Sequence, residues 1–268
     1  MTKQDVLYQI VVKLSRPPFL EDLINIAAGK QSLESLKLES TPYARVELAR
    51  VLMASSYEAV DKELMSILEQ EISEIKSKLP RSYRTTAESL RELFILEDIP
   101  SRVEAGDPGF AKYTACRGRS ILCYISTYIT RVREEMERTR EDPWSALSIL
   151  AALLYGIYTR HAEGLKVLGL KHPLAEELEV LRGVAKGPGA IYYSSAVEKI
   201  AQLASLWIKD PIEYFASEAK VVYEASKTCL YFRGGLLNVL THFFITRYYE
   251  SKLLRIIASR RVESLAHA

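Results

Sequence analysis

Six helix-start signals are spread along the chain, and they constrain its fold more than any other feature of the sequence. In four of them a Ser, Thr or Asp precedes a carboxylate by three residues, so that the two side chains can satisfy free backbone amides. In the other two a proline takes the first helical position, where its missing N–H costs nothing. The signals are Ser55…Glu58, Thr85…Glu88, Ser195…Glu198, Asp210…Glu213, Thr41-Pro42 and Asp142-Pro143. We therefore expect an all-α, multi-helix bundle.

Apolar residues between these signals recur with helical spacing. One stripe runs from Val60 to Leu79 and another from Ile121 to Met136, whereas no segment alternates convincingly as a half-buried strand does. We expect an N-terminal helical unit over 1–110 and a C-terminal unit over 111–268, which can also form one continuous domain. The tetrapeptides 59–62 and 196–199 are alike, which allows a funnel of repeated helical units, although shared capping chemistry explains the likeness equally well. Breaks are expected at Arg16-Pro17-Pro18, Pro80, 100–109, 169–173, 183–189 and Gly234-Gly235.

Composition excludes several classes of protein. The 268 residues are 48% hydrophobic and 26% charged, as in a globular protein, and the net charge of +2 is far from that of a dedicated nucleic-acid binder. The longest uncharged run, from Pro143 to Thr159, is shorter than the roughly 20 apolar residues of a membrane span and indicates a buried helix. Charges near the start, where a signal peptide needs an apolar run, favour the cytoplasm. Scarce Asn and Gln favour a thermophilic source.

No motif predicts a cofactor, a metal or a catalytic group. The segment 186–189 is rich in glycine but lacks the Gly-Lys-Ser/Thr ending of a phosphate loop, so we expect a plain turn. The histidines have no partner at zinc-ligand spacing, and the cysteines form no CxxC, so we expect buried thiols in a reducing compartment. These residues are His161, His172, His242, His267, Cys116, Cys123 and Cys229.

Mixed charges between Arg131 and Arg140 predict a solvated helix face, because residues of opposite sign lie three and four positions apart. The alternative is a basic strip that docks nucleic acid. It would combine cations with interleaved tyrosines on which bases stack. Its residues would be Lys112, Arg117, Arg119, Tyr113, Tyr124 and Tyr128, with the C-terminal arginines.

The segment from Leu236 to Arg261 follows the Gly234-Gly235 break and is apolar on both sides of a helical wheel, which predicts a central helix. It resembles the C-terminal part of the non-catalytic C subunit of archaeal-type rotary ATPases, the family of the eukaryotic vacuolar ATPase d subunit. The matching residues are Phe243, Phe244, Arg247, Glu250, Leu254, Arg255, Ile256, Ile257 and Arg261. The sequence departs at Leu253, where the family has asparagine, and at Arg260, where glycine is common. Asp98-Ile99 resembles the start of a related helix in that family, and we expect Pro100 to break it.

The resemblance implies a structural coupling subunit, without nucleotide, metal or other cofactor, that links the central shaft to the membrane rotor ring. Its partners would be other ATPase subunits, and it would attach to the membrane peripherally through them. A helical nucleic-acid accessory protein and an enzyme built from dispersed residues stay open as alternatives. The residues expected to contact partners are Arg247, Glu250, Arg255, Arg260 and Arg261.

Arg247 and Glu250 fall within the apolar stripe of this helix, three residues apart, so they can pair. Two roles are open for them. They form a partly buried ion pair that fixes the helix, or one of them reaches a rotor or shaft subunit.

Overall fold

The computed structural model describes residues 2–36, 44–168 and 178–266, in which helices and their connections form the whole fold and no strand occurs. The expected all-α, multi-helix bundle is therefore confirmed. The α-helices are α1 (Lys3–Leu14), α2 (Leu20–Ala27), α3 (Leu48–Met53), α4 (Tyr57–Lys78), α5 (Arg81–Arg91), α6 (Ile99–Glu104), α7 (Ile121–Glu137), α8 (Trp144–Val167), α9 (Glu179–Val184), α10 (Ala190–Lys209), α11 (Pro211–Phe232) and α12 (Leu236–Ala266). Short 3₁₀ helices are η1 (Leu33–Leu36), η2 (Glu92–Asp98), η3 (Pro108–Cys116) and η5 (Gly187–Gly189).

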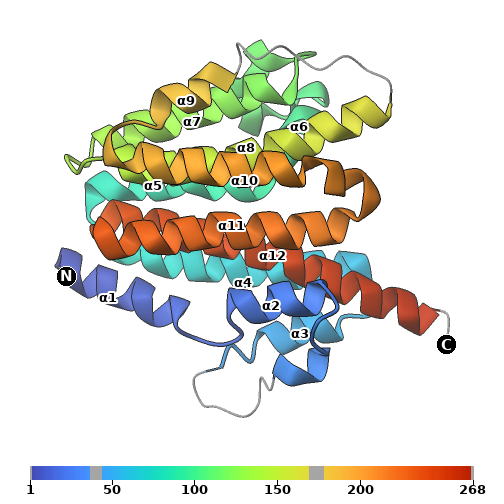
Figure 1. Ribbon diagram of the computed structural model, residues 1–268. Coiled ribbons are helices and arrows are strands. Elements are labelled where there is room, and N and C mark those ends of the chain that lie inside the picture. The colour runs from blue at the N-terminus through green and yellow to red at the C-terminus, as the bar shows by residue number, and fades with distance from the viewer. Residues whose placement is uncertain (1, 37–43, 169–177, 267–268) are drawn as a thin grey trace.

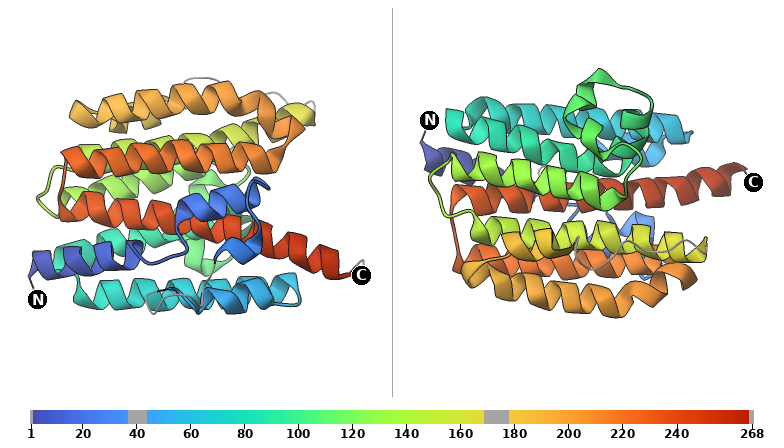
Figure 2. Two further views of the ribbon diagram at one scale, coloured as in Figure 1. Left: turned by 60° about the horizontal axis from the view of Figure 1, so that its bottom comes forward. Right: turned by 90° about the horizontal axis from the view of Figure 1, so that it is seen from above.

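The long helices lie side by side, with their axes roughly aligned, and α12 runs through the middle of them (Figure 1). Figure 2 shows α12 between α4 and α5 on one side and α8, α10 and α11 on the other. It packs against α1, α2, α3, α4 and α5 from the first part of the chain and against α8 and α11 from the second. The buried apolar residues of all these helices belong to one continuous core.

The two predicted apolar stripes are buried as expected. Val60, Leu64 and Ile72 of α4 are at most 5% exposed, and Ile125 and Val132 of α7 are at most 1% exposed. Both helices therefore turn the predicted face to the core, where each fully buried aliphatic side chain contributes roughly 1.5–3 kcal/mol.

The helix starts are confirmed in part. Asp210 caps α11 and accepts from the amides of Ile212 and Glu213. The cap of α4 is Ser56 rather than Ser55, and α8 begins at Trp144, one residue after the expected proline. Two expected starts are wrong, because Thr85 lies inside α5 and Ser195 inside α10. Thr41-Pro42 lies outside the described residues.

The expected break over 169–173 lies outside the described residues, and the one over 183–189 begins inside α9. Most of the other expected breaks separate helices, but Pro100 does not. It occupies the first turn of α6, where a proline lacks only an amide that would be free anyway. The expected break over 100–109 is therefore wrong at its start. The breaks at Pro80 and at Gly234-Gly235 separate α4 from α5 and α11 from α12. Residues 59–62 are the third to sixth residues of α4, whereas 196–199 are the seventh to tenth of α10, so the tetrapeptides do not mark corresponding helix starts.

The long uncharged run forms the first two thirds of α8, and its residues from Leu147 to Leu154 are all buried. The expected buried helix is confirmed. Among the described helices, none combines the length and the apolar character that crossing a bilayer requires.

Two of the three cysteines are joined, contrary to the expectation of buried thiols. A disulfide links Cys116, the last residue of η3, to Cys123 in the first turn of α7. The sequence offered no CxxC spacing to suggest this bond. The turn between the two elements brings the sulfurs together. Only Cys229 is a buried free thiol.

Candidate functional site

The central helix α12 is buried on both sides, as its sequence predicts. Leu240 and Phe243 on one stripe and Ile245 on the other side are all 0% exposed, while Ile256 is half-buried. Charged and phenolic side chains interrupt this apolar surface, and they form two clusters that face different neighbours. These clusters are the most unusual feature of the described residues, because burying a charge is costly unless it is paired and hydrogen-bonded.

The first, which we call the Arg247 cluster, consists of Arg45, Glu71, Arg247 and Glu250. Arg247 donates to both oxygens of Glu71 at 2.8 and 2.9 Å and to both oxygens of Glu250 at 2.8 Å. Its remaining donor bonds the carbonyl of Lys13 at 3.0 Å, so all five N–H groups have acceptors. Arg45, just before α3, bonds Glu250 at 2.8 Å and lies 3.5 Å from Glu71. The predicted pairing of Arg247 with Glu250 is confirmed.

The four side chains of the Arg247 cluster are at most 9% exposed and carry two positive and two negative charges. Burial alone would raise the pKa of Glu71, but the charges of Arg247 and Arg45 outweigh it and lower that pKa. Burial likewise opposes the charged form of Arg247, whereas Glu250 and Glu71 raise its pKa. Glu71 and Arg247 therefore stay ionised at neutral pH, and the four formal charges of the cluster sum to zero.

Arginines of α12 also bind the carboxyl ends of the first three helices. Besides Arg247 at the end of α1, Arg260 donates to the carbonyl of Ala27 at 2.7 Å, and Arg261 donates to the carbonyl of Leu52. Ala27 is the last residue of α2, and Leu52 lies in the last turn of α3. Such carbonyls have no partner within their own helix and carry the negative end of its dipole. Arg255 adds an ion pair at 2.6 Å with Asp61 of α4.

All five residues expected to contact partners therefore have partners within the chain. Through these contacts α1, α2, α3 and α4 are tied to α12. Arg247 and Glu250 are buried and cannot touch another protein unless helices separate. Arg255, Arg260 and Arg261 keep part of their surface in solvent. The expected contact of these residues with other subunits stays a prediction, and these three arginines are the ones that an approaching protein can reach.

On its other side α12 contributes to the second cluster, which we call the Glu218 cluster. Arg160 of α8 pairs with Glu218 of α11 and donates to Glu97 of η2 and to the Tyr248 hydroxyl, each at 2.9 Å. Tyr249 donates to Glu218 at 2.9 Å. The cluster comprises Glu97, Arg160, Glu218, Tyr248, Tyr249 and Lys252, and the formal charges of its two acidic and two basic residues again sum to zero.

Burial has opposite outcomes for the pKa values of the two acidic residues in the Glu218 cluster. Burial would raise the pKa of Glu97, but Arg160 and Lys252 outweigh it and lower that pKa to about 2. Glu218 is 0% exposed, and burial raises its pKa despite Arg160. A glycine makes room for this carboxylate: a Cβ at Gly156 of α8 would lie 2.5 Å from Oε1 of Glu218. The absence of a side chain at position 156 is thus a condition of the cluster.

His242 of α12 is a third buried polar group. Its Nδ1 lies 2.7 Å from the hydroxyl oxygen of Ser226, and its ring stacks on Tyr223 with centroids 5.5 Å apart. Burial lowers the pKa of His242 to about 4, and the charges of Lys227 and Arg247 act in the same direction. The imidazole is therefore neutral at physiological pH.

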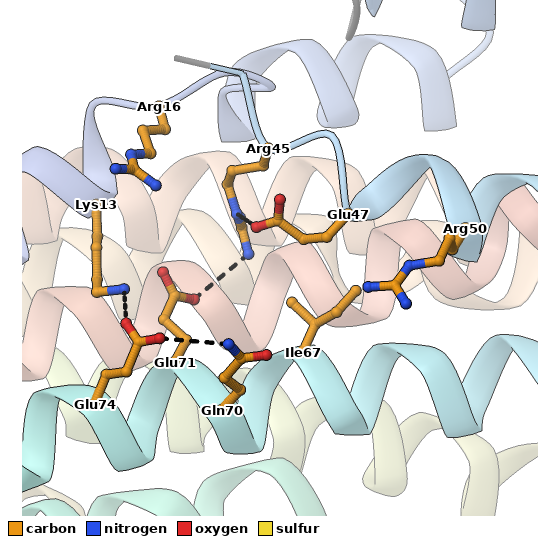
Figure 3. Close-up of a pocket in the computed structure, with 9 residues that line it drawn as sticks. All are labelled: Lys13, Arg16, Arg45, Glu47, Arg50, Ile67, Gln70, Glu71 and Glu74. Atoms are coloured by element: carbon orange, nitrogen blue, oxygen red, sulfur yellow. Dashed lines mark hydrogen bonds and ion pairs between the residues drawn. The ribbon is translucent and has the colours of Figure 1, made fainter. Parts of the chain in front are cut away.

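A cavity opens onto each cluster. The first, of about 320 Å³, has Arg45, Glu71 and Arg16 in its wall, with Lys13 and Glu74 paired at 2.7 Å (Figure 3). The second, of about 350 Å³, lies beside the Glu218 cluster and is mainly apolar, with Trp207 and Phe215 in its wall. Among the described residues, no group of three or more His, Cys, Asp or Glu could hold a metal, and His172 and His267 lie outside them.

Most residues of the alternative basic strip are buried or paired within the chain. Tyr113, Tyr124 and Tyr128 are at most 1% exposed and cannot stack with bases. Lys112 and Arg131 both pair with Glu92, and Arg117 pairs with Glu104. The expected solvated face is present in part, because Arg138 pairs with Glu135 at 2.6 Å and Arg133 with Glu137 at 3.8 Å.

Sequence reasoning found one pair of the Arg247 cluster and missed Arg45 and Glu71, which come from distant segments. It also missed Arg160 and Glu218. A signal for these two exists in retrospect: Arg160 directly follows the longest uncharged run, and Glu218 lies among Phe215, Ala216, Ala219 and Val222. A charge at a position where the helical pattern requires an apolar residue indicates a buried partner.

Comparisons of the chain with families of known proteins, with curated proteins and with solved structures give no match.

Proposed function

We propose that this chain is a non-catalytic coupling subunit of an archaeal-type rotary ATP synthase or ATPase, which links the central shaft to the membrane rotor ring. The observation that carries the proposal is the position of the residues that resemble this family. They lie on α12, the helix against which most of the others pack. We infer that the chain attaches peripherally to the membrane through rotor and shaft proteins.

The mechanical properties of the bundle support such a role. A part that passes torque must not shear internally, and close-packed interiors transmit strain. In this chain α12 is tied to α1, α2, α3 and α4 through arginines and to η2, α8 and α11 through the Glu218 cluster. A force applied to either half of the bundle therefore reaches the other half through directed, charge-assisted bonds.

Copurification from native membranes tests the proposal. The tagged chain should sediment with the membranes, bring down rotor-ring and shaft proteins, and be released by a low-salt wash with chelator, without detergent. It should not bind protein-free liposomes. Isolation without any rotor or shaft protein, or tight binding to the liposomes, would contradict the proposal.

Variants then locate the contact. Arg255→Gln/Arg260→Gln changes two of the reachable arginines of α12, and Arg91→Gln changes an exposed arginine of α5 that pairs with Glu69. All three substitutions should leave the chain folded, because Arg91 and Arg255 belong to exposed or partly exposed pairs worth roughly 0–1 kcal/mol and Arg260 makes a single bond to the carbonyl of Ala27. If α12 meets a partner through these residues, the double variant copurifies less than the parent and Arg91→Gln copurifies equally. Equal recovery of all three proteins would remove Arg255 and Arg260 from the interface.

A further inference from the structure

The Cys116–Cys123 disulfide has one reachable and one buried sulfur. Cys116 is 1% exposed, and its Sγ lies 3.5 Å from the hydroxyl oxygen of Thr127. Cys123 is only half-buried and lines a cavity of about 470 Å³, together with Arg119, Ser126 and Val180. An incoming thiolate can therefore approach Cys123 but not Cys116.

The surroundings of Cys123 also stabilise the thiolate form of its own sulfur. Cys123 is the third residue of α7, a helix of 17 residues, and its own amide bonds the carbonyl of Ser120 at 3.0 Å. A sulfur in the first turn lies at the positive end of the helix dipole, and Arg119 adds a cation to the same cavity. Cys229 has none of these features: it is buried on α11, and burial raises its pKa to about 11.

We propose that Cys116 and Cys123 form a thiol–disulfide exchange site at which a dithiol reductant attacks Cys123. The bond is thus a reversible modification site as well as a link between η3 and α7. This inference does not depend on the proposed coupling role, because it concerns a region far from the arginines of α12 along the chain.

A thiolate of the reductant attacks Sγ of Cys123, the bond between the two cysteines breaks, and Cys116 leaves as a thiolate to which the Thr127 hydroxyl can donate. The second thiol of the reductant then attacks its own sulfur in the mixed disulfide and releases Cys123 as a thiolate. Two electrons pass from the dithiol, which becomes a disulfide, to the protein, which gains two thiols.

Reduction of the folded chain tests the site. After graded exposure to dithiothreitol, free thiols are alkylated with iodoacetamide and located by peptide mass spectrometry, while circular dichroism monitors folding. Cys116 and Cys123 should become alkylated in the folded protein, with Cys229 unlabelled as the internal control. A bond that persists until the helical signal is lost would overturn the proposal. A parallel reaction with reduced thioredoxin identifies the source of the dithiol: reduction by both reagents indicates a protein dithiol, and reduction by dithiothreitol alone indicates a small one.

Single variants test the asymmetry of the two sulfurs. Cys116→Ser leaves the thiol of Cys123, and Cys123→Ser leaves the thiol of Cys116. Cys123 should react with iodoacetamide roughly tenfold faster or more, because its access and its thiolate fraction act in the same direction, and its alkylation rate should titrate below the ordinary thiol pKa of about 8.5. The Cys116→Ser/Cys123→Ser variant shows whether the chain folds without the bond. Equal rates for the two thiols, or faster alkylation of Cys116, would overturn the assignment.

Discussion

Each charged residue of the Arg247 and Glu218 clusters compensates the buried charge of a neighbour, so the loss of one residue destabilises the folded protein. Glu250 lies between two guanidiniums at 2.8 Å, so its removal leaves one excess positive charge in the Arg247 cluster, whose residues are at most 9% exposed. The free-energy cost of removing that charge from water is then no longer offset by a partner, which destabilises the folded state.

We therefore expect Glu250→Gln to lower the free energy of unfolding by about 3–5 kcal/mol. Arg255→Gln is the matched control on the same helix, because it breaks a partly exposed pair with Asp61 and should cost about 0–1 kcal/mol. Urea unfolding at neutral pH measures both. A Glu250→Gln protein that unfolds like the parent would show that the cluster is open to solvent.

His242 makes stability depend on pH. Its pKa falls from an ordinary value of 6.5 to about 4 on folding, so the unfolded chain binds a proton more readily than the folded one. Stability is therefore complete above pH 6.5 and is lost as the pH falls toward 4.

Between pH 7 and pH 5 this one group should cost about 2 kcal/mol. His242→Asn, which removes the titrating ring, should lose that much less stability over the same interval in urea unfolding, whatever its stability at pH 7. Glu97 titrates lower, with a pKa of about 2, and leaves this interval almost unaffected. Identical pH dependence in parent and variant would mean that the ring is protonated in the folded protein.

At the scale of elements, α8 contains two glycines, one in a crowded and one in an open environment. At Gly156 a Cβ would lie 2.5 Å from the Glu218 carboxylate, which Arg160 and Tyr249 hold in place. At Gly164 nothing lies within 4 Å. The same substitution therefore has opposite consequences at two positions of one helix.

Gly164→Ala should stabilise the protein by about 0.5–1 kcal/mol, because alanine has the higher helix propensity. Gly156→Ala should destabilise it by about 1–3 kcal/mol, because overpacking displaces the carboxylate. Thermal melts of the two variants beside the parent give the comparison. A rise in melting temperature for Gly156→Ala would show that Glu218 moves at no cost.

The sequence predicted those parts of the elements that depend on local pattern. The stripes of α4 and α7, the central position of α12 and the pairing of Arg247 with Glu250 all follow from helical spacing. Thr85 and Ser195 were wrongly predicted to start helices, because a helix that has already begun at Arg81 or Ala190 continues through residues that could also cap one. The partners Arg45 and Glu71 could not be predicted, since they lie 205 and 176 positions from the residues of α12 that they bond.

At the scale of the whole molecule, α12, which falls in the predicted C-terminal unit, packs against helices of both predicted units. It closes the core for helices on either side of residue 110, and the two clusters attach it to both. Removing the contacts of one half would therefore expose apolar and charged surface of the other. We expect the two halves to unfold together.

The two tryptophans provide a natural test of this cooperativity. Trp144 and Trp207 both lie beyond residue 110, so their fluorescence reports the second half, whereas far-ultraviolet circular dichroism reports the helices of both. The two signals should change at the same urea concentration. A loss of helical signal that precedes any change in fluorescence would show that residues 1–110 unfold as a separate unit.

The ties between α12 and the earlier helices also have a consequence for biosynthesis. A ribosome releases α1 to α11 before α12, so Arg45, Glu71 and the carbonyl ends of α1, α2 and α3 emerge without their counterparts. The nascent chain must keep these groups hydrated until α12 arrives. The buried clusters thus form only after α12 has been translated, and nascent helices that wait for it are natural clients for chaperones.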